Sequence, residues 1–261
     1  MSASDRGRDS WFTDRGFHDD HGAAVAMIPE GLSSANMSLA EPLTSVMRAI
    51  YWNPPSPGDR CLILGAGPSG LLALQVLGSL FPTSMVEIVD RNDFRLQVGR
   101  DLGATVAINI DTEGELLTNR GLTAHGDALD YVFDALPHVE ASVPRSVRSM
   151  AKALLRPGGK YVVYGATTMP QSMDTWSILA KGLTVSSAPF DVRLFPMSKS
   201  ASVLAHAVHL LGTGVIDAEP LVTHQIPFAD EDGVRAAFAH YGDHEDLKTV
   251  ITFEDSGARG L

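Results

Sequence analysis

Short apolar runs alternate with amphipathic stretches through most of the chain. Six of these runs predict buried strands, at 61–64, 85–90, 106–110, 128–134, 160–165 and 183–188. Apolar residues at helical spacing predict helices at 39–51, 71–77, 94–102, 143–154 and 199–211. Strands that alternate with helices form right-handed parallel crossovers. The pattern therefore predicts an α/β fold, a doubly wound parallel sheet of six strands with its ligand crevice at the carboxyl ends of the strands.

The expected helices end at recognisable signals. Gly103 stops the helix at 94–102, and Arg156-Pro-Gly-Gly159 closes the helix at 143–154. The last long helix is expected to turn five residues inward, Ala201, Leu204, Ala205, Val208 and Leu211. Beyond it, the pattern predicts a strand, a helix and a strand outside the main sheet, at 221–228, 231–240 and 247–253.

The first strand runs into a glycine-rich turn, Gly65-Ala-Gly-Pro-Ser-Gly70. Gly65 permits a sharp turn, Gly67 lets a phosphate approach the backbone, and Gly70 lets the following helix pack close to the strand. Pro68 suits the first helical turn, where its missing N–H is no loss, and Ser69 lies in the same turn. Because the free N–H groups at the start of a helix favour an anion, this turn predicts a site for a pyrophosphate.

An acidic residue stands at the end of the second strand. Asp90 lies 20 residues after Gly70, near the spacing of the carboxylate that accepts the ribose hydroxyls in dinucleotide-binding (Rossmann) sheets. A carboxylate there repels a 2′-phosphate, so NAD(H) is favoured over NADP(H), although the neighbouring Arg91 could weaken that preference. Two alternatives stay open. One is a glycine turn in another α/β protein; the other is an S-adenosylmethionine methyltransferase, which usually has an acid where this chain has Leu64.

The composition narrows the partners and the compartment. The net charge of −11 and the lack of a Lys/Arg cluster argue against nucleic acid and anionic membranes as partners. A single cysteine excludes an internal disulfide and fits the reducing cytoplasm. The uncharged run 61–82 is interrupted by four glycines and an interior proline, so we interpret it as a buried strand, turn and helix and not as a membrane span. The polar first ten residues are not typical of a secretory signal.

Short motifs along the chain resemble the medium-chain dehydrogenase/reductase superfamily, in particular its zinc-dependent alcohol and polyol dehydrogenases. They lie, in order, at 29–33, 39–43, 57–60, 65–70, 90, 95–96, 102–105, 155–159, 221–224 and 248–251. The resemblance implies an oxidoreductase that moves a hydride between the nicotinamide of NAD(H) and a small alcohol, polyol or carbonyl substrate. It also implies a second, barrel-like catalytic domain, formed mostly by the first half of the chain. Only 40 residues precede Glu41 here, so we expect a small remnant of that domain.

The resemblance implies roles for two further residues, and it shows that this sequence lacks the ligands of the family's metal sites. Glu41 looks like the acid that in related polyol dehydrogenases approaches the metal directly or through water; the alternative is an acid in the first turn of a helix, favoured by the helix dipole. Lys248 resembles a family position near the phosphates. The zinc-binding cysteine, the His-Glu pair and the four-cysteine lobe of that family have no counterpart, and Cys61 lies on a buried strand. Zinc is therefore not expected from this chain alone.

Backbone and arginine positions are expected to border the rest of the cofactor. Arg91 and Arg95 would flank the adenosine. The residues that follow the fourth and fifth strands would line the nicotinamide end, at Ala135, Leu136, Gly165 and Ala166.

The histidines have structural interpretations. The cluster His18-Asp-Asp-His21 could hold a divalent ion, but adjacent residues of an extended chain point in opposite directions, which favours a solvated loop. His206 and His209, three residues apart, are expected at the half-exposed flank of a helix. His224 matches a family position of structural meaning. The sequence contains no nucleophile paired with a base at a catalytic spacing.

We divide the chain into an N-terminal arm with a remnant of the catalytic domain (1–38), an NAD-binding domain (39–215) and a C-terminal remnant of the catalytic domain (216–261). The edge strand at 183–188 predicts a homodimer or higher oligomer, because an exposed apolar edge needs cover. Two hypotheses of function follow. One is the cytoplasmic, NAD-dependent oxidoreductase acting on a small molecule; the other is a non-catalytic nucleotide-binding remnant or a truncated dehydrogenase.

Overall fold

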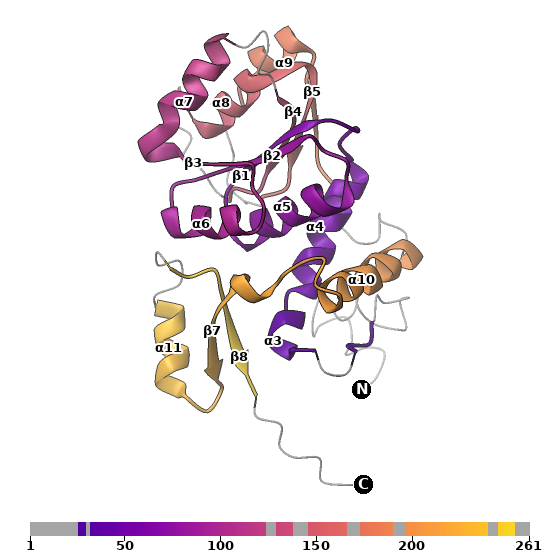
Figure 1. Cartoon of the computed structure of the whole chain (residues 1–261), viewed down its shortest axis with the longest axis vertical. Helices are drawn as coiled ribbons and strands as arrows, with labels where there is room; N and C mark the ends of the chain where they lie inside the picture. Colours follow the sequence, from indigo (N-terminus) through magenta and orange to yellow (C-terminus); the bar gives the residue numbers. More distant parts are fainter. Residues whose placement is uncertain are drawn as a thin grey trace, which may run out of the picture.

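The computed structural model describes residues 26–29, 32–123, 129–137, 146–165, 173–189, 197–239 and 245–253. Its centre is a six-stranded sheet in the order β3-β2-β1-β4-β5-β6, in which all neighbours pair in parallel (Figure 1). The strands are β1 (Arg60–Leu64), β2 (Met85–Asp90), β3 (Val106–Asn109), β4 (Leu129–Asp134), β5 (Leu155–Val163) and β6 (Thr184–Ser186). The strand order reverses between β1 and β4, which is the switch point of a doubly wound sheet. The predicted fold class is confirmed.

Helices cover both faces of this sheet. Alternate residues of β1 face opposite layers, Cys61 and Ile63 one core, Leu62 and Leu64 the other, and all four are fully buried. The first layer contains α4 (Ala40–Trp52), α5 (Pro68–Leu80), α6 (Asp93–Asp101) and α10 (Met197–Gly212), with the short α3 (Ser34–Met37) beside it. The opposite layer contains α7 (Ile110–Thr123), α8 (Val147–Leu154) and α9 (Thr175–Lys181) (Figure 1).

Three helices and one strand boundary differ from the prediction. The chain forms α3, α7 and α9 where no helix was expected. Strand β5 begins at Leu155, so Arg156-Pro-Gly-Gly159 belongs to the strand and does not form a turn that closes a helix. Leu129 pairs with Leu155 and Tyr131 pairs with Lys160, and this register shift accommodates the intervening residues as an irregular segment of the ladder.

The last long helix is rotated from the predicted face. Its buried residues are Val203, Ala207, Val208, Leu210 and Leu211, whereas Ala205 is exposed. The segment carries apolar residues around most of its circumference, so periodicity alone could not fix which stripe faces the core.

The C-terminal unit has the predicted strand-helix-strand order. After a 3₁₀ turn, η3 (Glu219–Leu221), the chain forms β7 (Val222–Pro227), α11 (Glu231–Ala239) and β8 (Lys248–Thr252), and β7 and β8 pair in parallel. Gln75 of α5 exchanges two hydrogen bonds with the backbone of Asp217, at 2.9 and 2.7 Å. Arg95 of α6 donates through Nη2 to the carbonyl of Asp246 at 2.9 Å. The unit is therefore tied to the side of the sheet that α5 and α6 cover (Figure 1).

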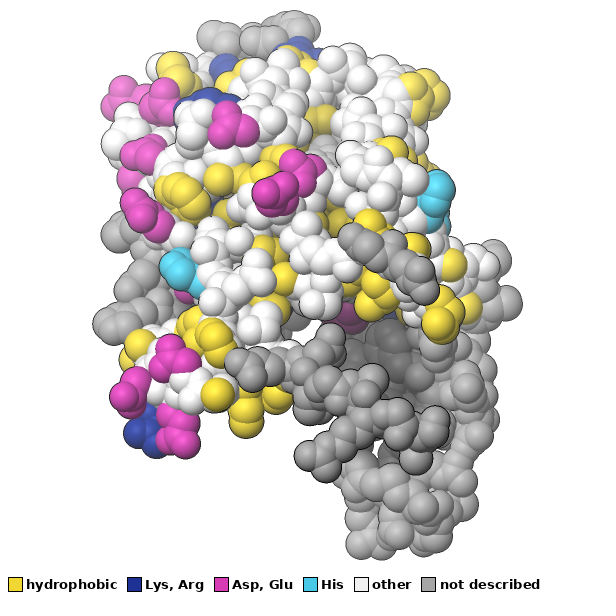
Figure 2. Space-filling model, turned by 60° about the horizontal axis from the view of Figure 1, so that its bottom comes forward, with side chains coloured by type: hydrophobic (Ala, Val, Ile, Leu, Met, Phe, Trp, Pro, Cys, Tyr) yellow, Lys and Arg dark blue, Asp and Glu magenta, His cyan; other side chains and the backbone are white. Residues whose placement is uncertain are grey.

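None of the helices in the described ranges is long and apolar enough to cross a membrane. On the face shown in Figure 2, Asp and Glu side chains are spread over the described residues, and Lys and Arg side chains form no large patch there. The expectation that nucleic acid is not a partner stays a prediction.

Candidate nucleotide-binding site

The turn between β1 and α5 has three glycines with three different surroundings. Gly65 has a φ of +96°, in the region that favours glycine, and its N–H donates to the carbonyl of Val89 at 2.8 Å. A Cβ on Gly70 would lie 1.8 Å from the carbonyl oxygen of Gly65, so no other residue fits there without movement of the backbone. A Cβ on Gly67 would meet no described atom within 4 Å. The space beside Gly67 is therefore open to a ligand.

The start of α5 carries no side chain that would compete with a bound anion for the free N–H groups of the helix. Gly67 is the N-cap and has no side chain with which to cap the helix, and Pro68 follows in the first turn. The first turn holds no acidic residue. The N–H groups and the positive end of the helix dipole thus face the open space beside Gly67, as a bound diphosphate requires.

Asp90 is fixed against this turn. Its Oδ2 accepts a hydrogen bond from the N–H of Ala66 at 2.6 Å, and its Oδ1 accepts from the N–H groups of Arg91 and Asn92 at 2.8 and 3.0 Å. A carboxylate oxygen has two lone pairs, so Oδ2 keeps capacity for a further donor. Sequence reasoning expected Asp90 at the end of β2; it did not foresee that the carboxylate also holds the glycine turn.

The two arginines near Asp90 point to different neighbours. Arg91 is exposed, and its Nε lies 3.7 Å from Oδ2 of Asp111. Arg95 donates to Asp246 and so connects α6 to the C-terminal unit. Their expected contact with the adenosine stays a prediction.

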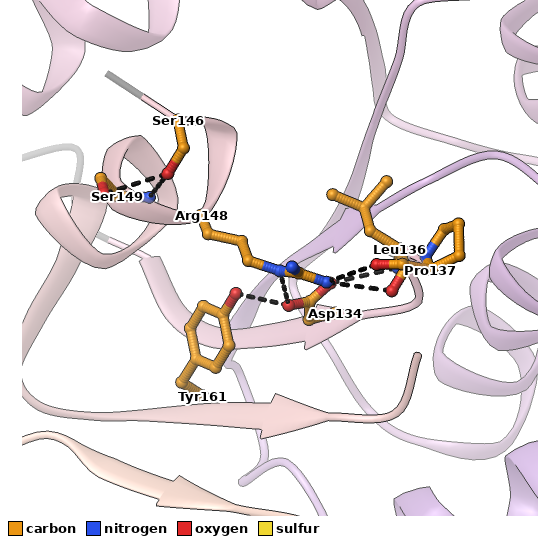
Figure 3. A network of polar contacts seen from close by, with 7 residues as sticks. All are labelled: Asp134, Leu136, Pro137, Ser146, Arg148, Ser149 and Tyr161. Atoms are coloured by element: carbon orange, nitrogen blue, oxygen red, sulfur yellow. Dashed lines mark hydrogen bonds and ion pairs between the residues drawn. The ribbon is translucent and has the colours of Figure 1, made fainter. Parts of the chain in front are cut away.

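A buried polar network holds the segment after β4 (Figure 3). Arg148 of α8 donates through Nε to Oδ2 of Asp134 at 2.6 Å and through Nη2 to the carbonyls of Leu136 and Pro137, both at 3.0 Å. The hydroxyl of Tyr161 donates to the same Oδ2 at 2.8 Å, and Oδ1 of Asp134 accepts from the N–H of Leu136 at 3.1 Å. Burial raises the pKa of the Tyr161 hydroxyl, mainly by desolvation, so this group stays protonated as the donor.

The segments after β4 and β5 meet at Gly165. The N–H of Gly165 donates to the carbonyl of Asp134 at 2.8 Å, and a Cβ on Gly165 would lie 1.8 Å from the carbonyl oxygen of Leu136. Leu136 also lies near the glycine turn, because its Cδ2 would be 3.2 Å from a Cβ on Gly65. The structure therefore brings Gly65, Leu136 and Gly165 together at the switch point. Ala166 lies outside the described residues.

Glu41 stands in the first turn of α4 and is exposed. Desolvation raises the pKa of its carboxyl, while the positive charges of Lys248 and Arg48 act in the opposite direction. The structure thus brings Glu41 near Lys248, at the start of β8. Its position in the first turn of the helix places the carboxylate at the positive end of the helix dipole, and its expected role at a substrate stays a prediction.

The described residues do not fit a catalytic zinc ion. Such an ion needs about three protein ligands and an open position. Within the described ranges no three His, Cys, Asp or Glu side chains are grouped to hold a metal, and the charged neighbours of Glu41 are the cations Lys248 and Arg48. Cys61 is fully buried, and desolvation raises the pKa of its thiol, so it is held as a neutral thiol. The cluster from His18 to His21 lies outside the described residues.

Two of the three described histidines have side-chain partners. Nδ1 of His224 lies 3.2 Å from both Oγ1 of Thr223 and Oδ1 of Asp246, which links β7 to the start of β8. His206 is exposed, with its Nδ1 3.4 Å from the hydroxyl of Tyr51, and His209 is exposed in the last turn of α10.

The family described as zinc-binding dehydrogenase matches residues 68–193, which include α5, the acid of β2 and the network around Asp134. The chain is 30% identical to an L-threonine 3-dehydrogenase from Bacillus velezensis over 203 residues, which are 77% of this chain and 54% of that protein. The chain belongs to the zinc-type medium-chain dehydrogenases. It spans about half the length of that threonine dehydrogenase.

Two further similarities are to RspB proteins from two strains of Escherichia coli. The starvation-sensing protein RspB of strain K12 is 27% identical over 230 residues, 87% of this chain and 62% of RspB. A crystal structure described as a short chain alcohol dehydrogenase, rspB, from Escherichia coli CFT073, complexed with NADH, has a TM-score of 0.69 and 26% identity, and the match covers 87% of this chain and 62% of that one. The fold of this chain is thus similar to that of a protein whose crystal structure contains NADH.

The network around Asp134 was not predicted from the sequence of this chain. One signal was present, since Asp134 ends β4 as Asp90 ends β2. Arg148 gave no such signal, because a lone arginine in an amphipathic helix is ordinarily a solvated residue. Only the packing of α8 on the sheet brings its guanidinium to Asp134.

Proposed function

We propose that this chain binds NAD(H) across the carboxyl ends of β1, β2 and β4 and serves hydride transfer with a small alcohol, polyol or carbonyl compound. The observation that carries the proposal is the open space beside Gly67, with the start of α5 facing it and Asp90 fixed against the same turn. Main-chain N–H groups of the turn hold the diphosphate, and Asp90 accepts the ribose hydroxyls. The segments at Leu136 and Gly165 border the nicotinamide, which supplies or accepts the hydride.

The preference for NAD(H) over NADP(H) rests on the charge of Asp90. A titration of the purified chain with NADH and with NADPH, followed by the fluorescence of the reduced nicotinamide, tests both binding and preference. We expect NADH to bind at least about tenfold more tightly, because a 2′-phosphate would be placed beside the carboxylate. Equal affinity for the two cofactors contradicts the preference, and no binding of either contradicts the proposed function.

The variant Asp90→Asn separates recognition from the support that Asp90 gives to the turn. We expect it to narrow the NADH/NADPH affinity ratio by about tenfold, because it removes the repulsion and weakens the ribose contact together. The control is Asp101→Asn, which removes an exposed acid of α6 whose partner is Gln97. If Asp90→Asn weakens both cofactors equally, Asp90 acts only by holding the turn.

A second candidate is a nucleotide-binding protein without dehydrogenase turnover. It is favoured by the surroundings of Glu41, where the described residues offer cations and no group of metal ligands. An assay with a panel of primary alcohols, secondary alcohols and polyols, with and without added zinc, separates the two. Tight NADH binding with no oxidation across the panel supports the second candidate.

The oligomer and the compartment belong to the same proposal. We expect a homodimer, supported by the exposed edge position of β6 in the sheet. The single cysteine supports the cytoplasm as the site of action.

A further inference from the structure

The ion pair between Arg148 and Asp134 is buried at the end of β4, and its contribution to the stability of the fold does not by itself explain its presence. The side chain of Asp134 is 2% exposed and that of Arg148 is 12% exposed. Removing two charges from water is costly, and a buried pair is often no more stabilising than apolar residues of similar volume. The pair therefore calls for an explanation beyond the stability of the fold.

The bonds of Arg148 are directed at backbone carbonyls. Its Nη2 reaches the carbonyls of Leu136 and Pro137, at 3.0 Å each, while its Nε is held by Asp134. Asp134 in turn accepts from the N–H of Leu136. The segment after β4 is thus held by a donor and an acceptor at once, and Figure 3 shows both converging on it from α8 and β4. A planar, forked guanidinium suits this arrangement, and a lysine would not reproduce it.

This segment borders the switch point. Leu136 lies between the glycine turn and Gly165, and the close approach at Gly165 leaves the segment no room to shift toward β5. In a doubly wound sheet the ligand crosses the strand ends at this point, and the half of a dinucleotide on the β4 side carries the second base, here the nicotinamide.

We propose that Arg148 is a positioning residue for the nicotinamide half of the cofactor, an inference that rests on the proposed function. Arg148 fixes the backbone at Leu136 and Pro137, and Tyr161 keeps Asp134 oriented so that Asp134 can hold the guanidinium. Neither Arg148 nor Tyr161 needs to touch the cofactor. The adenosine and diphosphate half depends instead on Asp90 and the glycine turn.

The chain offers a matched control in a second buried arginine pair. Arg120 of α7 binds Glu87 of β2 through two hydrogen bonds, at 2.7 and 3.0 Å, and Glu87 is 1% exposed. Glu87 lies in the middle of its strand, away from the strand ends. Replacing Arg120 with lysine perturbs a comparable pair without touching the segment after β4.

The experiment compares NADH with ADP-ribose, which lacks the nicotinamide, by calorimetric titration of the full chain and of Arg148→Lys and Arg120→Lys. We expect Arg148→Lys to weaken the binding of NADH by about tenfold, which is the size of effect expected when one charge-assisted hydrogen bond is lost. The binding of ADP-ribose should weaken by less than about twofold. The emission maximum of bound NADH should shift toward that of free NADH, because the ring is held less closely. Arg120→Lys should change both ligands by the same small factor.

A milder variant covers the case in which Arg148→Lys fails to fold. Tyr161→Phe removes only the hydroxyl that donates to Asp134. We expect this variant to weaken the binding of NADH by about two- to threefold and to leave the binding of ADP-ribose nearly unchanged. An equal loss of both ligands in either variant, or no loss of NADH, overturns the positioning role and leaves the proposed function standing. If the unchanged chain binds neither NADH nor ADP-ribose, the proposed function fails and the positioning role fails with it.

Discussion

Gly67 and Gly70 serve different needs within one turn, and substitution separates them. Gly70→Ala places a Cβ 1.8 Å from a backbone oxygen, so we expect a loss of about 2–4 kcal/mol in the free energy of unfolding. Gly67 has an ordinary φ of −70° and open space around it, so Gly67→Val should keep the melting temperature within about 3 °C of the parent chain. The same valine should weaken the binding of NADH by about tenfold or more, because its side chain would occupy the place of the diphosphate.

Thermal unfolding and an NADH titration of the two variants check this prediction. Gly70→Ala serves as the control for turn geometry. Unchanged NADH affinity in Gly67→Val would place the diphosphate elsewhere, even if the fold is as described.

Glu41 gives a pH dependence whose sign follows from its surroundings. Its pKa is raised from an ordinary value of 4.5, chiefly by desolvation, so the folded chain holds this proton more tightly than the unfolded chain. The contribution of Glu41 to stability is therefore fully present below pH 4.5 and is lost as the pH rises through its folded pKa. Glu41→Gln does not titrate, so its melting temperature relative to the parent chain should rise between pH 4.5 and neutral pH and then level off.

Melting curves at half-unit steps of pH measure this difference. The opposite slope, with Glu41→Gln losing stability toward neutral pH, would mean that attraction to the helix dipole and to Lys248 and Arg48 exceeds desolvation.

The helix α7 shows what a local pattern can and cannot specify. Strands and the helices α4, α5 and α6 have strong apolar periodicity and identifiable ends, and the sequence predicted them. In α7, Leu117 is the one described side chain that is fully buried, and two glycines weaken its helical preference. Its place in the fold depends on Arg120, which reaches Glu87 on β2. A contact between residues 33 apart in the chain is not visible in a window of one helix.

The same contact gives a prediction about the α7 layer. Arg120→Ala leaves Glu87 charged, buried and unpaired, so we expect a loss of about 3 kcal/mol or more in the free energy of unfolding. The double variant Glu87→Gln with Arg120→Met should recover much of that loss, because no unpaired charge is then buried. Urea unfolding measures both. A loss below about 0.5 kcal/mol in Arg120→Ala would show that water reaches Glu87 once the arginine is gone.

The candidate site was predictable in the parts that rest on sequence spacing. Gly65, Gly67, Gly70 and Asp90 follow one another at intervals set by a strand, a turn and a helix, so the sequence alone brings them together. The network of Asp134, Arg148 and Tyr161 comes from β4, α8 and β5, whose side chains converge only when the sheet is assembled. The link of Arg95 to Asp246 depends in the same way on the packing of two units.

The two edges of the sheet differ in what surrounds them, and this bears on assembly. At one edge β3 carries the partly exposed Val106. At the other edge is β6, which follows α9 along the chain. The side chains of Trp176 and Leu179 on α9 are 73% and 75% exposed. An open edge strand and exposed large apolar side chains on the helix that precedes it are typical of a surface that a second copy covers.

We therefore expect the chain to form a dimer through β6, with a mass in light scattering of twice 27.9 kDa. Thr184 is exposed on β6, so Thr184→Lys should leave the folded chain intact while it sets two positive charges against each other across a two-fold axis. That variant should shift the mass to a single chain. Val106→Lys, on the opposite edge strand, is the control and should stay dimeric. A dimer that withstands Thr184→Lys but not Val106→Lys would assign the interface to β3, and a parent chain of single mass at all concentrations would remove the dimer altogether.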